Sequence, residues 1–170
     1  MAAAQKKHAR TPVTRAVIAL REAGIQFGQH PYPYEDRGGT KVSSRELGVA
    51  EHCVIKTLVM EDEAARPLIV LMHGDRTVST KQLARQLGVK RVTPCTPQTA
   101  ERHTGYQVGG TSPFGTRRPL KVYIETSIIE LERLYINGGK RGFLVSMNPE
   151  SLELVLPELV FVDVAKERRE

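Results

Sequence analysis

Apolar residues follow two spacings along this chain, one typical of helices and one typical of strands. A helical spacing that starts at residue 11 and ends at Gly24 predicts a first helix. Two almost wholly apolar runs, 53–60 and 67–73, flank a charged turn and predict an antiparallel hairpin. By the same reasoning we expect further strands at 25–34, 89–92, 120–124, 134–136, 143–147 and 159–164, and helices at 41–47, 80–87, 96–103, near 127 and after 148.

The order of these elements indicates the fold class. Strands and helices follow one another irregularly, with both hairpins and crossovers, which favours an α+β domain whose mixed sheet is surrounded by helices. A length of 170 residues with 40% hydrophobic content suits one domain. We expect a flexible N-terminal tail at residues 1–10, the domain at 11–165 and a C-terminal tail at 166–170.

Charge and composition narrow the class of partner. The formal net charge of +6 favours an anionic partner such as nucleic acid, although part of the excess lies in residues 5–10. No apolar run is long enough for a membrane span and no signal peptide is evident, so we expect a cytoplasmic protein. Cys53, Cys95 and the five histidines lack metal spacing, so we expect reduced thiols, no disulfide, no metal and no cofactor.

Residues 104–115, TGYQVGGTSPFG, contain four glycines and one proline among twelve residues. Glycine permits positive φ and close approach of another backbone, so a tight structural turn is one interpretation of this loop. The other is a binding loop, because successive N–H groups around Gly109 and Gly110 can converge on an oxyanion or a phosphate. Both interpretations stay open on the residues alone.

Lys56 interrupts the apolar strand at 53–60. Its ammonium could point into a cleft, or could simply extend to water at a sheet edge. The basic residues at 138–142 and Arg117-Arg118 are individually typical of solvated loops, but together they would suit a polyanion. The chain has no G-x-S-x-G elbow, P-loop or Cys-His signature, and Ser112 is a poor nucleophile candidate.

Three motifs in register carry a resemblance to a known family. VIKTL at 54–58, the glycine loop at 104–115 and GGKRG at 138–142 together resemble the YbaK/EbsC family of aminoacyl-tRNA deacylases, and HPY at 30–32 resembles its aromatic-bearing segment. The similarity extends from about residue 11 to 164. It implies a compact α+β domain with a mixed, partly barrel-like sheet, related to the editing domain of bacterial prolyl-tRNA synthetases.

The resemblance also implies an activity. Members of this family are free-standing trans-editing enzymes that serve translation fidelity, and the YbaK branch removes mischarged cysteine from tRNA(Pro). Its reaction, of the Cys-tRNA(Pro)/Cys-tRNA(Cys) deacylase type, is assisted by the thiol of the substrate, which attacks its own ester and leaves a thiolactone. The implied partners are aminoacyl-tRNA, namely tRNA(Pro), and prolyl-tRNA synthetase.

Residue roles are carried over by matching positions. Lys56 and Gly109 match residues that the family needs for activity. We expect Lys56 to hold the terminal adenosine or its phosphate, and Gly109 and Gly110 to border the scissile carbonyl as catalytic residues. The expected substrate-binding residues are Tyr32, Thr57, Thr111, Ser112 and Pro113.

One departure from the family pattern leaves alternatives open. Well-known YbaK members have an acidic residue after the second glycine turn, whereas this chain has Phe143 and Leu144. Removal of alanine or another small amino acid from tRNA(Pro) is therefore the alternative within the same chemistry. A non-catalytic module that binds tRNA or a synthetase is another, and a small-molecule hydrolase is disfavoured by the missing nucleophile motif.

Overall fold

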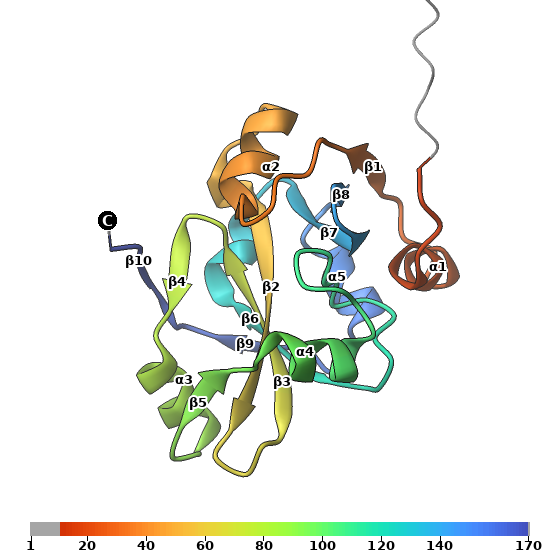
Figure 1. Ribbon diagram of the computed structural model, residues 1–170. Coiled ribbons are helices and arrows are strands. Elements are labelled where there is room, and N and C mark those ends of the chain that lie inside the picture. Colours follow the sequence, from red (N-terminus) through yellow and green to blue (C-terminus); the bar gives the residue numbers. More distant parts are fainter. Residues whose placement is uncertain (1–10, 170) are drawn as a thin grey trace, which may run out of the picture.

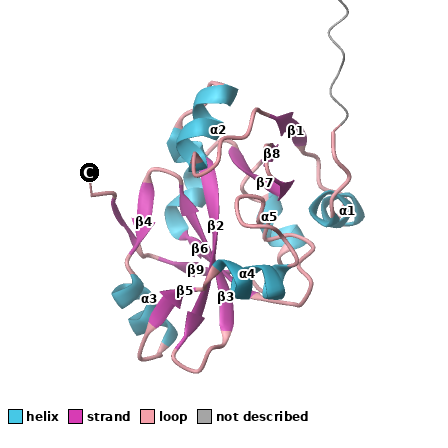
Figure 2. Cartoon of the chain, in the orientation of Figure 1, coloured by secondary structure: helices cyan, strands magenta, loops and turns pink. Residues whose placement is uncertain are grey.

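The computed structural model describes residues 11–169, so the tail expected at residues 1–10 lies outside the described part. Helices and strands are labelled in Figure 1 and coloured by type in Figure 2. The helices are α1 (Arg15–Glu22), α2 (Gly39–Leu47), α3 (Thr80–Leu87), α4 (Pro97–Thr104) and α5 (Ser151–Val155), with 3₁₀ turns η1 (Glu51–Cys53) and η2 (Thr126–Glu130). The strands are β1 (Gly28–Pro31), β2 (Val54–Asp62), β3 (Pro67–His73), β4 (Arg76–Val78), β5 (Val92–Pro94), β6 (Lys121–Glu125), β7 (Leu134–Lys140), β8 (Phe143–Met147), β9 (Val160–Val162) and β10 (Ala165–Glu167).

Most of these strands form one mixed sheet of eight strands. Its order is β1-β8-β7-β2-β3-β6-β9, and β5 branches from this path by pairing with β2. β2 and β3 are antiparallel, as the two apolar runs predict, whereas β3, β6 and β9 are parallel neighbours. The single α+β domain with a mixed sheet, predicted from the sequence, is confirmed.

Several element ends differ from the sequence prediction. The first helix begins at Arg15 and not at residue 11, because the Thr14 hydroxyl accepts a hydrogen bond from the Val17 N–H at 3.1 Å and caps it. The short strands β4 and β10 were not predicted, and they pair with each other as a separate sheet. β10 therefore occupies part of the segment expected to be a C-terminal tail.

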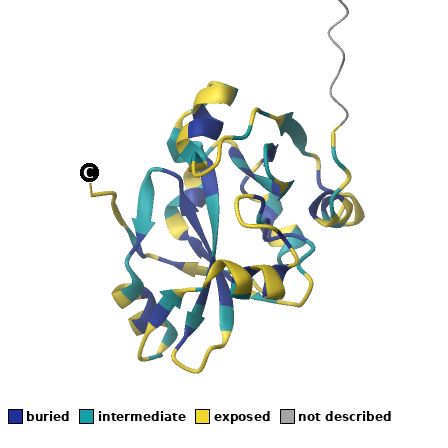
Figure 3. Ribbon diagram, in the orientation of Figure 1, coloured by how far each residue is buried: buried dark blue, intermediate teal, exposed yellow. Residues whose placement is uncertain are grey.

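Two apolar clusters pack on opposite faces of the sheet. Alternate residues of β3 divide between them, with Ile69 and Leu71 in one cluster and Val70 and Met72 in the other. The first cluster includes α1 and Phe114 of the glycine loop, and the second includes α3. Strands β3, β6 and β8 are buried along nearly their whole length, whereas the middle of β2 is only partly buried (Figure 3). No helix within residues 11–169 is long and apolar enough to cross a membrane.

One edge of β2 is paired at its two ends but open between them. Val54 and Ile55 pair with β7 in parallel, and residues 60–62 pair with β5 in the antiparallel sense. The Cys95 N–H donates to the Val59 carbonyl at 3.0 Å and closes the β5 side of this interval. Residues 56–58 therefore have no strand partner on this edge within the described chain.

The buried His73 side chain makes the folding stability dependent on pH. The His73 side chain lies next to the His52 carbonyl and the Ser127 hydroxyl, and burial lowers its pKa below the ordinary value of 6.5. Burial is also the largest cause of the lowered pKa values of His30 and His103. As the pH falls below 6.5, the unfolded chain therefore binds more protons than the folded chain, and folding stability is lost.

We expect the free energy of unfolding, measured by urea denaturation, to decrease from about pH 7 to about pH 5. Each of these histidines adds a slope of at most about 1.4 kcal/mol per pH unit. A His73→Gln variant should be less stable at neutral pH and less sensitive to acid in this interval. A free energy of unfolding that is independent of pH between these limits would contradict the prediction.

Candidate active site

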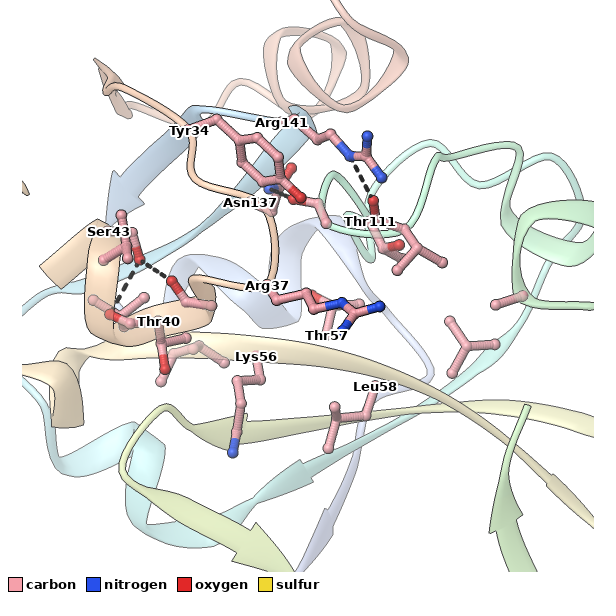
Figure 4. A pocket seen from close by; sticks show the side chains of 18 of the residues that line it. Tyr34, Arg37, Thr40, Ser43, Lys56, Thr57, Leu58, Thr111, Asn137 and Arg141 are labelled. Atoms are coloured by element: carbon pink, nitrogen blue, oxygen red, sulfur yellow. Dashed lines mark hydrogen bonds between the residues drawn. The ribbon is translucent and has the colours of Figure 1, made fainter. Parts of the chain in front are cut away.

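A cavity of about 540 Å³ lies over the open edge of β2. Its walls come from segments that are far apart in the sequence: β2, the segment before α2, the start of α2, the glycine loop and the β7–β8 hairpin (Figure 4). The sheet opens at this place because β7 and β5 take up only the two ends of the same edge. The cavity is therefore a consequence of strand pairing and not of a surface loop alone.

The glycine loop is held against the β7–β8 hairpin by side chains of the hairpin. Arg141 Nε donates to the Val108 carbonyl at 2.8 Å, and Asn137 Nδ2 donates to the Gly109 carbonyl at 3.1 Å. The Arg141 guanidinium also lies over the Tyr34 ring, 5.2 Å from its centroid. These contacts hold two carbonyls of the loop against the hairpin and bring the second glycine motif to the first.

Two adjacent glycines permit this close approach. Gly109 has a φ of +89°, and a Cβ atom there would lie 2.7 Å from the Tyr34 hydroxyl oxygen. A Cβ atom on Gly110 would lie 2.8 Å from the backbone nitrogen of Arg141, which cannot move as a side chain can. Both interpretations of the loop therefore have a structural basis, because Gly110 packs against the hairpin and is absent from the cavity lining, whereas Gly109 forms part of the cavity wall.

The two glycines differ in what their N–H groups can do. The Gly110 N–H donates to the Gln107 carbonyl at 2.8 Å within the turn. The Gly109 N–H has no acceptor within the described chain, and Gly109 lines the cavity. Of the two expected oxyanion donors, Gly109 is therefore the one with a free donor at the cavity.

The other loop residues expected at the site divide in the same way. Thr111 lines the cavity, whereas Ser112 and Pro113 do not. Ser112 is fully buried, and its hydroxyl accepts a hydrogen bond from the Phe114 N–H at 3.2 Å. That bond shapes the loop from inside and leaves the hydroxyl turned away from a ligand.

Lys56 belongs to β2 at the open edge, but its ammonium lies on the far side from the glycine loop. Lys56 pairs with Met72, which belongs to the second apolar cluster, whereas Thr57 is on the face of the first. The ammonium donates to the Arg76 carbonyl (Figure 4 shows it directed away from Thr111). Burial, and then repulsion from Arg168, lowers the pKa of Lys56.

Thr57 and Tyr32 complete the expected substrate-binding set, and both line the cavity. The Thr57 hydroxyl oxygen is buried and has no hydrogen-bond partner in the described chain. Because a buried hydroxyl without a partner is costly, this oxygen is suited to bind a polar ligand group. Burial is also the largest cause of the raised pKa of Tyr32, which remains a neutral phenol.

Several cavity residues were missed by the sequence analysis. Arg37, Tyr34 and Asn137 belong to loop or hairpin segments without a motif of their own, and only the fold brings them to β2. Cys95, which the sequence predicts only as a reduced thiol, lines the cavity beside Glu61. Burial, followed by the nearby carboxylate of Glu61, raises the pKa of Cys95 to about 11.

The glycine geometry predicts a graded set of alanine variants. Gly24 has a φ of +70° with nothing within 4 Å of a Cβ atom, so Gly24→Ala measures the backbone cost alone. That cost is about 1 kcal/mol of unfolding free energy or somewhat more. We expect Gly110→Ala to cost more than Gly24→Ala in chemical denaturation, because its Cβ atom would meet the backbone of Arg141.

Gly109→Ala combines the backbone cost with a close contact to the Tyr34 hydroxyl oxygen at 2.7 Å and a milder one to Arg141 Nε at 3.2 Å. Adding Tyr34→Phe removes that oxygen, and the double variant should recover part of the lost stability by the same measurement. If Gly110→Ala costs no more than Gly24→Ala, the glycine loop and the hairpin are not packed as described.

Comparison with known proteins agrees with this arrangement. Residues 38–154 match the family model of the aminoacyl-tRNA editing domain. The chain is 27% identical over 140 residues to the protein of Enterococcus faecalis named "Putative Cys-tRNA(Pro)/Cys-tRNA(Cys) deacylase EbsC", covering 82% of this chain and 85% of that protein. It is also 31% identical over 108 residues to proline–tRNA ligase of Nitratidesulfovibrio vulgaris, covering 64% of this chain but 17% of the ligase.

The fold has a close counterpart among solved structures. One described as "a putative trans-editing enzyme for prolyl tRNA synthetase" superposes with a TM-score of 0.78 at 21% identity, covering 89% of this chain and 95% of that one. The segment matched by the family model contains the open edge of β2, the glycine loop and Leu144 at the cavity wall. By the match of its sequence over most of its length, this chain belongs to the family of aminoacyl-tRNA editing domains.

Proposed function

We propose that this protein is a trans-editing deacylase that removes mischarged cysteine from tRNA(Pro). The observation that carries this proposal is a cavity with a free backbone donor at Gly109, carboxylates at Glu35 and Asp36, but no thiolate in its described lining. The one thiol in its lining, Cys95, has a pKa of about 11 and stays protonated at neutral pH. The described lining contains no histidine that could act as a base.

Such a cavity suits a reaction in which the substrate supplies its own nucleophile. The thiol sulfur of the cysteinyl group attacks the carbonyl carbon of the ester, and the negative charge moves to the carbonyl oxygen. Collapse of this intermediate breaks the bond to the ribose oxygen, which takes the thiol proton, and releases a thiolactone. A backbone N–H beside the developing oxyanion contributes roughly 10²–10³ in rate in such reactions.

In this mechanism the expected residues take distinct roles. Gly109 donates to the oxyanion, and Gly110, Ser112 and Pro113 keep the loop in shape. Thr57, Tyr32 and Thr111 bind the aminoacyl end through the cavity wall.

Lys56 supplies positive charge at the open edge of β2. Its ammonium reaches the terminal adenosine or its phosphate by leaving the Arg76 carbonyl. That movement is a rotation of the side chain around the open edge, so it requires no change in strand pairing.

The same proposal implies two partners, a tRNA and a synthetase. Aminoacyl-tRNA is the substrate, and the net charge of +6 favours its capture. Several relatives are proline–tRNA ligases, which connects this domain with prolyl-tRNA synthesis. We therefore propose prolyl-tRNA synthetase as the enzyme from which the mischarged tRNA is received.

Alanine is the second candidate for the amino acid removed. Leu144 is 4% exposed and lines the cavity at the position where the family pattern has an acidic residue. This side chain makes the wall apolar there, which favours a small uncharged side chain such as methyl. Alanine has no thiol, so its removal requires an attacking water in place of the substrate sulfur.

A charged-tRNA panel separates these candidates. We expect purified protein to release cysteine from Cys-tRNA(Pro) faster than serine or alanine from the matched tRNAs, because only cysteine carries the attacking thiol. Faster release of alanine would assign the alternative substrate. Binding of all three tRNAs without release would contradict deacylation and favour a non-catalytic module.

Lys56→Ala tests the role of the ammonium in the same assay. We expect deacylation of preformed Cys-tRNA(Pro) to fall by at least about tenfold, because a charge-assisted contact to the substrate is lost. Lys81→Ala removes an equal charge from the exposed surface of α3 and is the matched control. Unchanged deacylation by a folded Lys56→Ala protein would contradict the assignment.

A further inference from the structure

We propose that Arg37 forms an anion-binding site at the mouth of the cavity, and that its ligand is the phosphodiester that precedes the terminal nucleotide of tRNA. This inference rests on the proposed function for the identity of the ligand. The site itself is inferred from three features of Arg37: its backbone conformation, the direction of its side chain and its unpaired charge.

The backbone at Arg37 is unusual for an arginine. Its φ is +58°, in the left-handed region that favours glycine, although the two following residues are glycines and Arg37 itself is not. This conformation costs about 1 kcal/mol or more for a residue with a Cβ atom. It directs the side chain into the lining of the cavity, where Figure 4 shows it extending over Thr57.

The guanidinium of Arg37 has no partner within the described chain. The neighbouring arginine of the same region, Arg45, is paired with Glu35 at 2.7 Å, so its charge is already compensated. Arg37 is exposed and makes no ion pair or hydrogen bond to a described residue. Its five N–H donors are therefore available to a ligand at the cavity mouth.

The surroundings of Arg37 contain charges of both signs. Glu35 and Asp36 also line the cavity; Glu35 is paired with Arg45, whereas Asp36 is exposed and makes no ion pair with Arg37. α2 begins two residues after Arg37 and has no side-chain cap, which adds positive potential from its first N–H groups. An anion is favoured near Arg37 and disfavoured near Asp36, which makes the two residues opposite tests of one site.

The chemistry of the proposed substrate identifies the anion. In an aminoacyl ester the carboxylate of the amino acid is consumed by the bond to ribose, and its α-amino group is a cation that Arg37 would repel. The nearest negative charge to the ester is the phosphodiester on the 5′ side of the terminal adenosine. A planar guanidinium matches two phosphate oxygens, so Arg37 would fix the depth to which the 3′ end enters. With the phosphodiester at Arg37, the Lys56 ammonium is left to bind the terminal adenosine itself.

The test compares two probes that differ by this phosphodiester and the cytidine attached to it. Adenosine has no phosphodiester, and the dinucleotide cytidylyl-(3′→5′)-adenosine has one. We expect an NMR titration to show tighter binding of the dinucleotide than of adenosine to the wild-type protein. Arg37→Gly, which accepts the left-handed backbone, should weaken dinucleotide binding about tenfold and leave adenosine binding unchanged.

Stability and charge controls separate the guanidinium from the loop. Arg37→Gly should unfold at the same temperature as wild type or higher, because it removes the backbone strain. Arg37→Lys should keep part of the affinity for the dinucleotide, and Asp36→Asn should not weaken it. For full-length tRNA, Arg37→Gly should lower the slope of log affinity against log salt concentration by about one.

Three results would overturn the site. These are equal binding of dinucleotide and adenosine to wild type, an equal loss of both probes in Arg37→Gly, and a loss in Asp36→Asn as large as that in Arg37→Gly. None of these measurements requires turnover. A protein that binds the dinucleotide through Arg37 but releases no amino acid would keep the site and contradict the proposed deacylation.

Discussion

The arrangement of the site depends on the way one strand edge is shared. β2 gives the two ends of its edge to β7 and β5 and keeps the middle open. An open edge on a central strand presents backbone donors and acceptors that must find a partner or water. Here the cavity occupies that interval, so every element that surrounds it is positioned relative to residues 56–58.

A second constraint brings the two glycine-rich segments together. Arg141 and Asn137 bind carbonyl groups of the glycine loop, and Gly110 leaves room for the hairpin backbone. The loop is therefore shaped by residues that come about thirty positions later in the chain. Substitutions in the hairpin and in the loop are expected to be energetically coupled, as contacting residues generally are.

The sequence predicts the fold well where local patterns decide it. The hairpin of β2 and β3, α3 and β8 follow from apolar runs and glycine caps that depend on few distant contacts. β4 and β10 could not be predicted in this way, because each is only three residues long and is stabilised by pairing with the other. The predicted start of α1 is wrong because the sequence offers two threonines, Thr11 and Thr14, as the N-cap. Only the folded structure shows that Thr14 is the cap.

For the site, the sequence predicts which residues line the cavity better than it predicts where their side chains point. Lys56, Thr57 and Gly109 do line one cavity. The alternation of side chains along a strand does not, however, predict which face of the sheet packs against a loop that lies later in the chain. Arg37 carries a signal only in three dimensions, through its φ and its lack of a partner.

The protonated state of Cys95 has a consequence for redox chemistry at this site. Disulfide exchange requires a thiolate, and a thiol with a pKa of about 11 provides very little of it at neutral pH. A ligand that enters as a disulfide is therefore exchanged only slowly onto Cys95, and a ligand that enters as a thiol cannot be joined to Cys95 without an oxidant. The raised pKa that makes Cys95 a poor nucleophile also slows its oxidation, because oxidants react with the thiolate.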